Sequence, residues 1–280
     1  MKPQSDCAPT APTLFSPSWR NNMAALPLAG KHVVVTRPAG QATHLAEALV
    51  NLGAHPILFP VISILDLDDL KPVNDVARQL DDFHYAVFIS PNAVNKSLEH
   101  VLRHRSWPGS LRAVTVGASS AQALARHGIV NVLVPVGRFD SEALLELPEL
   151  QSVAGKRIVI FRGEGGRELL GETLRERGAE VTQVASYKRS TSSMDGTVLL
   201  KHWEDRTLDA ITMTSSEGLR NLFEMVGKLG QAWLRKTPLF VPHQRIAVQA
   251  GMLGLGAIHS TGPGDEGLVA GLLHYFDHHG

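Results

Sequence analysis

The feature of the sequence that most constrains its fold is an internal repeat with a period of 125 residues. The segment GKHVVVTRPAGQATHLAEALVNLGA at residues 30–54 aligns without a gap with GKRIVIFRGEGGRELLGETLRERGA at residues 155–179, and ten of the 25 positions are identical. Unrelated segments of this length share about one or two. A duplication predicts two related halves of about 125 residues, each with the same order of elements.

The same offset is found again further along the chain. It aligns VFISPNAV at residues 87–94 with TMTSSEGL at residues 212–219, so that Ser90 is aligned with Ser215. Recovery of one offset at separated places excludes a chance similarity of a single segment.

Each half alternates short β-branched runs with segments of helical periodicity. VVVT at residues 33–36 is a predicted buried strand, and leucines at helical spacing follow it until Gly53. The other predicted strands cover residues 85–90, 113–117, 129–135, 157–161, 181–187, 209–214 and 245–249, and the other predicted helices cover residues 119–127, 166–177 and 216–226. This alternation is typical of parallel sheets, so the sequence predicts two doubly wound α/β domains of the flavodoxin-like kind.

Composition excludes several classes of function. Lys and Arg number 27, as do Asp and Glu, so binding of nucleic acid through bulk charge is not expected. The single cysteine, Cys7, excludes a disulfide framework and a cysteine-based zinc site, and it fits a cytoplasmic protein. No membrane-spanning helix is predicted. Residues 1–29 are rich in proline and aperiodic, which predicts a disordered extension.

The carboxyl ends of the predicted strands are rich in Gly, Ser, Thr and Arg. Ligands bind at these ends in open α/β sheets, and each such loop precedes a helix whose first N–H groups attract anions. A set of such loops facing one cleft suits a large polyanion, although Gly and Ser also serve simply as turn and capping residues. The candidate binding residues are Thr36, Arg37, Ser90, Asn92, Ser119, Ser120, Arg162, Gly163, Arg167, Ser215 and Ser216, and the last such loop is predicted at residues 248–251.

Motifs for cofactor chemistry are missing from the sequence. It has no Walker A, H-E-x-x-H or G-x-S-x-G pattern, and RGEGGR lacks the dinucleotide fingerprint, so neither a metal nor an organic cofactor is expected. Tyr187 ends a predicted strand and precedes a polar segment. Its hydroxyl is a candidate proton donor in a cleft, and the alternative is a packed ring with a solvated hydroxyl.

The order of these segments resembles that of the uroporphyrinogen-III synthase family. The resemblance rests on VVVTRPAGQATHLAEAL, FPVISI, VFISPNAV, AVTVGASSAQAL, RIVIFRGEGGRELLGETLRERGAEV, the Tyr187 segment and TMTSSEGL, and it covers about residues 30–280. It implies a cofactor-free lyase of tetrapyrrole and haem biosynthesis, which cyclises hydroxymethylbilane with inversion of ring D and loss of water. The eight carboxylates of that substrate suit the loops described above. The resemblance further implies a cytoplasmic monomer that receives its substrate from the preceding deaminase.

The resemblance also implies a discontinuous domain and roles for particular residues. One domain would combine residues 30–58 with 190–280, the other would cover 65–182, and 59–64 and 183–189 would be linker strands. Tyr187 matches a tyrosine that assists departure of the hydroxyl. Ser90, Ser120 and Ser215 match serine or threonine positions of the family, and Arg245 falls near a basic one. The chain departs from the family pattern at Asn92 and over residues 248–257.

Two other readings stay open at this stage. A two-domain module could close on an anion without catalysing a reaction. A nucleotide-dependent α/β enzyme is the other reading, weakened by the missing fingerprints.

Overall fold

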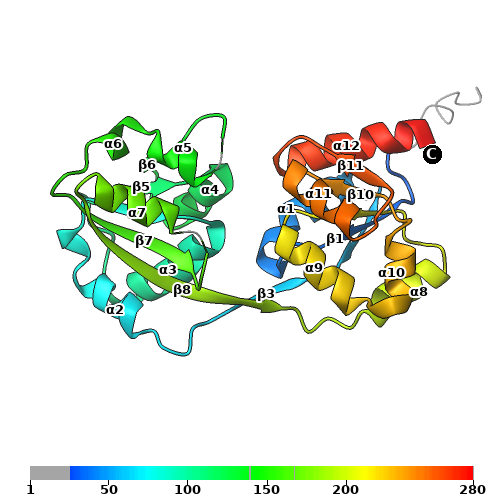
Figure 1. Ribbon diagram of the computed structural model, residues 1–280, viewed down its shortest axis with the longest axis horizontal. Coiled ribbons are helices and arrows are strands. Elements are labelled where there is room, and N and C mark those ends of the chain that lie inside the picture. The colour runs from blue at the N-terminus through cyan, green and yellow to red at the C-terminus, as the bar shows by residue number, and fades with distance from the viewer. Residues whose placement is uncertain (1–25, 139, 167, 280) are drawn as a thin grey trace, which may run out of the picture.

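Two parallel sheets organise the chain into two α/β units. The computed structural model describes residues 26–138, 140–166 and 168–279, and the two units lie side by side with β3 and β8 running between them (Figure 1). The first sheet has the strand order β11-β10-β9-β1-β2, and the second has the order β3-β8-β7-β4-β5-β6. The predicted two-domain α/β fold is confirmed.

The strands and helices have the following bounds. The first sheet consists of β1 (His32–Val35), β2 (His55–Leu58), β9 (Ala210–Thr212), β10 (Leu239–Val241) and β11 (Ile258–Ser260). The second consists of β3 (Ile62–Leu65), β4 (Tyr85–Phe88), β5 (Arg112–Thr115), β6 (Val132–Leu133), β7 (Arg157–Gly163) and β8 (Glu180–Thr191). The helices of the first unit are α1 (Ala39–Asn51), α8 (Thr197–Glu204), α9 (Ser216–Met225), α10 (Gly227–Leu234), α11 (Gln244–Met252) and α12 (Gly264–His279), and those of the second are α2 (Lys71–Arg78), α3 (Pro91–His104), α4 (Ala118–Arg126), α5 (Ser141–Leu145), α6 (Pro148–Gln151) and α7 (Leu169–Glu176).

The register of strand pairing repeats with the offset found in the sequence. In the pair β1–β2, His32 lies opposite His55, and in the pair β7–β8, Arg157 lies opposite Glu180, each 125 positions later. The same offset relates the strand order β2-β1-β9-β10-β11 to β8-β7-β4-β5-β6. Each unit is thus one copy of a five-stranded sheet with the flavodoxin-like order 2-1-3-4-5.

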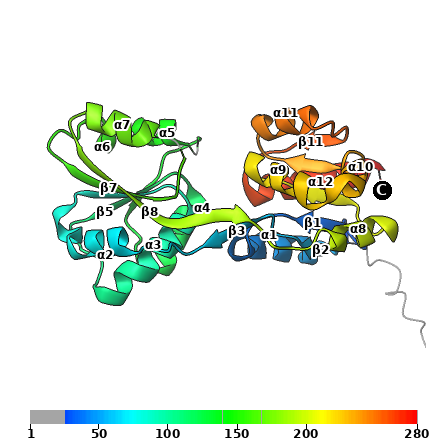
Figure 2. The ribbon, with the colours of Figure 1, turned by 60° about the horizontal axis from the view of Figure 1, so that its bottom comes forward.

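Helices cover both faces of each sheet because successive strand residues point to opposite faces. In β1, Val34 packs into a cluster with α8, α9, α10 and α11, whereas Val33 and Val35 pack against α1 and α12. In β4, Phe88 packs against α2, α3 and α4, whereas Val87 packs against α5, α6 and α7. Figure 2 shows this for the second sheet, with α5, α6 and α7 on one side and α2 and α3 on the other.

One predicted strand is a helix in the structure. Residues 245–249 lie inside α11, and the strand at this point of the first sheet is β10. Ile246 and Ala250 are buried, whereas Val248 between them is exposed. In a strand these three residues would share one face, so the pattern fits a helix and not a strand. The repeat offset itself places residues 245–249 on 120–124, within α4. Residues 248–251 are consequently part of a helix and not a strand-end loop.

Both connections between the units start at the carboxyl end of a sheet. The chain leaves β2 at Leu58 and enters β3 at Ile62, and β8 continues past its pairing with β7 into an antiparallel pairing with β3. That antiparallel pair joins residues 62–65 to 188–191, whereas 183–187 still pair with β7. The carboxyl ends of both sheets therefore face the connection and each other.

The start of the described chain belongs to the first unit. The extension expected over residues 1–29 lies outside the described residues as far as residue 25. Residues 26–29 form a turn in which Leu28 is fully buried, and the N–H of Leu28 donates to the carbonyl of Leu52. The expected extension therefore does not include Leu28. Within the described ranges, none of the helices combines the length and apolar character needed to cross a membrane.

We predict that Gly196→Ala destabilises the first unit. A Cβ at Gly196 would clash with the carbonyl oxygen of Met225, which is backbone and cannot turn aside. Overpacking of this kind lowers the free energy of unfolding by about 1–3 kcal/mol. Urea denaturation measures it, with Gly251→Ala as control, because a Cβ at Gly251 meets nothing within 4 Å. Equal stabilities of the two variants would contradict the prediction.

Candidate active site

A pair of hydroxyl groups marks the carboxyl end of the second sheet. Ser90 follows β4 and is the N-cap of α3, where its Oγ accepts the N–H of Ala93 at 3.1 Å. The Tyr187 hydroxyl, from β8, lies 3.1 Å from the same Oγ, and either group can donate. Two predicted residues 97 positions apart in sequence are thus in direct contact.

The ring of Tyr187 is packed, with 4% of the residue exposed. It belongs to the apolar cluster that contains Phe88 and Phe161. Gly163, at the end of β7, allows the ring to lie against the backbone, since a Cβ there would be 2.8 Å from Cζ of Tyr187. The structure therefore brings Ser90, Gly163 and Tyr187 together, and the phenol is held in one place by its neighbours.

Arg162 lies beside this group and is held by partners of its own chain. Its guanidinium donates to Glu168 at 2.8 Å, to the side chain of Gln183 and to the carbonyl of Gly165, and 9% of its side chain is exposed. The hydrogen bond from Gln183 and then the contact with Arg162 lower the pKa of Glu168 below its ordinary value of 4.5. Arg162 is thus already neutralised. Arg167 lies outside the described residues.

An open hollow of about 430 Å³ borders this network. Its lining joins the end of β7 to the start of α7 and to β8. Gly163 separates the hollow from the ring of Tyr187. The residues along it are Arg162, Gly163, Glu164, Gly165, Glu168, Arg175, Gln183 and Ala185.

Thr36 and Arg37 end β1 and have partners within the first unit. The Thr36 hydroxyl is buried and donates to the carbonyl of Thr212 at 2.7 Å. Arg37 forms an ion pair with Asp265 in the first turn of α12, and the same carboxylate bonds His44. Their side chains fix the sheet and α12.

Asn92 joins the two units directly. Its Oδ1 accepts a hydrogen bond of 2.8 Å from Nε2 of Gln41. Gln41 lies in the first turn of α1 and Asn92 in the first turn of α3, so helix starts from different units meet here. Gln41 was not among the predicted residues, because it lies inside α1 and no pattern in the sequence pairs it with Asn92.

The starts of α9 and α4 differ in how their side chains are used. Ser215 is the N-cap of α9 and accepts the N–H of Gly218 at 2.8 Å, while Ser216 is half-buried. In the first turn of α4, Ser119 is exposed and Ser120 is buried. The Ser120 Oγ has no hydrogen-bond partner among the described residues.

Arg245 is exposed in the first turn of α11. It lies next to the N-cap His243, whose pKa is lowered by partial burial and then by Arg245. Arg245 is therefore a cation at the start of α11, whereas the sequence predicted a strand at this place.

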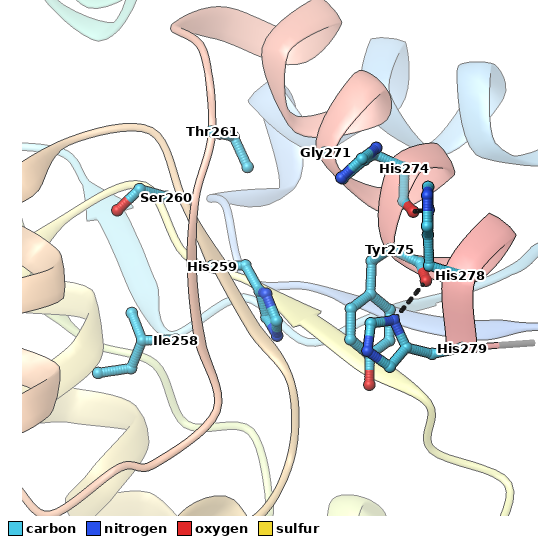
Figure 3. A pocket seen from close by; sticks show the side chains of 9 residues that line it. All are labelled: Ile258, His259, Ser260, Thr261, Gly271, His274, Tyr275, His278 and His279. Atoms are coloured by element: carbon cyan, nitrogen blue, oxygen red, sulfur yellow. Dashed lines mark hydrogen bonds between the residues drawn. The ribbon is translucent and has the colours of Figure 1, made fainter.

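A second hollow among the described residues, of about 440 Å³, lies elsewhere. It runs between the edge strand β11 and α12, and the side chains of His259, Tyr275 and His279 line it (Figure 3). The Nδ1 of His278 and the Nδ1 of His279 lie within hydrogen-bond distance of helix carbonyls. No predicted site residue lines it, and within the described ranges no group of three or more His, Cys, Asp or Glu residues is arranged to hold a metal ion.

We predict that Glu168 stabilises the fold in a pH-dependent way. Because its folded pKa is depressed, the ionised carboxylate stabilises the native state above the unfolded pKa, and this contribution is lost as the pH falls through the folded pKa. The stability difference between the unaltered protein and Glu168→Gln should shrink from about pH 5 to about pH 3 in chemical denaturation. A difference that stays constant over this range would contradict the prediction.

Comparison with known proteins agrees with the fold. A family model described as "Uroporphyrinogen-III synthase HemD" matches residues 43–270. The uroporphyrinogen-III synthase of Salmonella typhimurium is 35% identical over 224 residues, which cover 79% of this chain and 91% of the relative. The uroporphyrinogen-III synthase of Synechococcus elongatus is 33% identical over 216 residues, with coverages of 75% and 81%.

Solved structures of this kind share the architecture. A mutant uroporphyrinogen III synthase from Thermus thermophilus aligns with a TM-score of 0.55 at 18% identity, over 88% of this chain and 99% of the other. The uroporphyrinogen-III synthetase of Helicobacter pylori aligns with a TM-score of 0.55 at 15% identity and the same coverages. At these identities the likeness shows the fold alone, while the sequence matches show the family. The chain belongs to the uroporphyrinogen-III synthase family.

Proposed function

We propose that this chain is a lyase that cyclises hydroxymethylbilane to uroporphyrinogen III, with inversion of ring D and loss of water. The observation that carries the proposal, beyond family membership, is the contact of the Tyr187 and Ser90 hydroxyls at a carboxyl sheet end that faces the other unit. The Gln41–Asn92 hydrogen bond supports the proposal, because it joins helix starts from both units two residues beyond Ser90.

The first step breaks the bond between the terminal carbon and its hydroxyl group. The adjacent pyrrole nitrogen supplies the electron pair, so the carbon side needs little assistance. The departing oxygen takes the proton of Tyr187 and leaves as water. Ser90, hydrogen-bonded to the phenol, stabilises the phenolate that forms. The terminal carbon then bonds to the substituted α-carbon of ring D and gives the spiro intermediate. The older bond from that α-carbon to its methylene bridge breaks, and the bridge carbon bonds to the unsubstituted α-carbon of ring D. The proton lost from that carbon returns to the phenolate of Tyr187.

Substrate carboxylates are proposed to bind at helix starts more than at arginines. The first turns of α3, α4 and α9 carry N–H groups that have no partner within the helix, and Ser90 and Ser215 cap two of these helices. Arg37 and Arg162 are already paired with carboxylates of the chain. Exposed Arg245 is the cation of the predicted set that adds charge to a helix start.

We further propose how the protein is organised and where it works. Residues 30–58 with 190–280 form one domain and 65–182 the other, a division supported by the two sheets. The single cysteine supports a cytoplasmic location. The protein acts as a monomer that receives its unstable substrate from the preceding deaminase.

The test of the proposed activity supplies enzymically made hydroxymethylbilane and separates the products by isomer. Formation of uroporphyrinogen III in excess over isomer I, which arises without catalysis, supports the proposal. A protein that binds the bilane while only isomer I forms would instead be a binding module.

We predict that Tyr187→Phe lowers kcat for isomer III formation by about 10–100-fold with little change in KM, because the proton donor is lost and the ring is kept. Its free energy of unfolding should change by about 1 kcal/mol or less, through one lost hydrogen bond. Tyr187→Ala should lose about 3–5 kcal/mol, because the ring fills a core position. Steady-state kinetics and melting of both variants measure this. Full activity of Tyr187→Phe would refute the acid role.

We predict that KM rises with salt. Substrate carboxylates held by helix starts and by Arg245 are partly solvated, so added ions screen them. Between about 50 and 300 mM NaCl, KM should rise roughly threefold or more while kcat changes little. Melting temperature over the same range controls for stability. A KM independent of salt would exclude electrostatic capture of the substrate.

A further inference from the structure

The strand that carries Tyr187 contains a β-bulge immediately before it. Along β7 and β8, Arg162 lies opposite Ala185, but the next residue, Gly163, lies opposite Tyr187. Ser186 is thus the extra residue, and its Oγ donates to the carbonyl of Arg162 at 3.2 Å. Pairing resumes beyond it, where the N–H of Glu164 donates to the carbonyl of Tyr187 at 2.9 Å.

The bulge changes the face of the sheet to which Tyr187 points. Side chains of a regular strand alternate between faces, so residues three apart point to opposite faces. Val181 and Val184 obey this rule, because Val181 packs with the cluster of α5, α6 and α7 and Val184 with the cluster of α2, α3 and α4. Tyr187 is three residues beyond Val184 and yet lies in the same cluster as Val184.

Without the extra residue, Tyr187 would point to the same face of the sheet as Gln183 and Ala185. Those two side chains line the open hollow beside Arg162, on the α7 side of the sheet. Ser90, the hydrogen-bond partner of the phenol, belongs instead to the start of α3. The bulge therefore carries the phenol to the face on which its partner lies.

We propose that Ser186 and Gly163 are positioning residues for the Tyr187 hydroxyl. Ser186 holds the bulge that selects the face, and Gly163 leaves the space in which the ring lies flat against β7. This proposal rests on the proposed function, because it assigns these two residues to the proton donor of that reaction.

The ring of Tyr187 occupies the space that a side chain at Gly163 would fill. A Cβ at this position would lie 2.8 Å from Cζ, 2.9 Å from Cε2 and 3.1 Å from the hydroxyl oxygen of Tyr187. The backbone of Gly163 is not in the left-handed region, so an alanine there adds no backbone strain, and the three atoms nearest to its Cβ all belong to Tyr187. The ring would have to move, and the 3.1 Å contact with Ser90 would be lost with it.

The experiment is a double-mutant cycle on kcat for isomer III formation. Gly163→Ala, Tyr187→Phe and the combined variant are compared with the unaltered protein, and Gly109→Ala is the matched control because a Cβ there meets nothing within 4 Å. We expect Gly163→Ala to lower kcat to within about threefold of Tyr187→Phe, with KM little changed. In the Tyr187→Phe background the same change should alter kcat by less than about twofold. Melting temperatures confirm that each variant is folded.

A second variant tests the bulge and guards against a folding defect in the first. Ser186→Ala removes the bond to the Arg162 carbonyl and should lower kcat by about two- to fivefold, again only when Tyr187 is present. Equal losses of kcat with and without the tyrosine hydroxyl would overturn the proposal, as would a rise in KM at constant kcat. A fully active Tyr187→Phe in a protein that makes isomer III would also overturn it and leave the proposed function intact. An unaltered protein that makes no isomer III would remove the proposed function itself.

Discussion

The antiparallel pairing of residues 62–65 with 188–191 is the constraint on which the rest of the molecule depends. Each parallel sheet is closed on both faces by helices, so its polar strand ends and helix starts gather at one edge. Because β2 and β8 both leave at that edge, the pairing of their extensions fixes the two edges toward each other. Without it, the helix starts of α1 and α3 would have no reason to meet at the Gln41–Asn92 hydrogen bond.

The candidate site shows why a buried side chain can still carry chemistry. Tyr187 has 4% of its surface exposed, and packing of the ring leaves its hydroxyl a single position beside Ser90. A proton donor gains more from a fixed position than from wide exposure, because its bond to the departing group must form without reorganisation. Of the sequence-based alternatives, the packed ring is found, but its hydroxyl contacts Ser90 and is not solvated. Its role as a proton donor is our proposal.

The repeat in the sequence predicts the two α/β units and most of their strands and helices. The features that could not be predicted depend on pairing between segments that are distant in the sequence. Ser90 and Ser215 were placed correctly at strand ends because a serine before a helix start is a local signal. The contact of Ser90 with Tyr187 joins positions 97 residues apart, and no local pattern contains it. The strand predicted at residues 245–249 is wrong because Ile246 and Val248 favour a strand locally. The repeat, which aligns these residues with the predicted helix at residues 119–127, was the better guide. The bulge at Ser186 is set by the partner strand and has no signature in composition.

The duplication also separates binding from chemistry. Arg37 and Arg162 occupy equivalent positions, and each is neutralised by a carboxylate of its own unit, so neither half keeps a free arginine there for the substrate. Ser90 and Ser215 are equivalent N-caps, so both halves keep the helix start that suits an anion. The position equivalent to Tyr187 is Ile62, a buried apolar residue of β3. In the proposed function, the matching helix starts of the two halves bind an extended polycarboxylate across both sheets, and the one phenol protonates it at a single end.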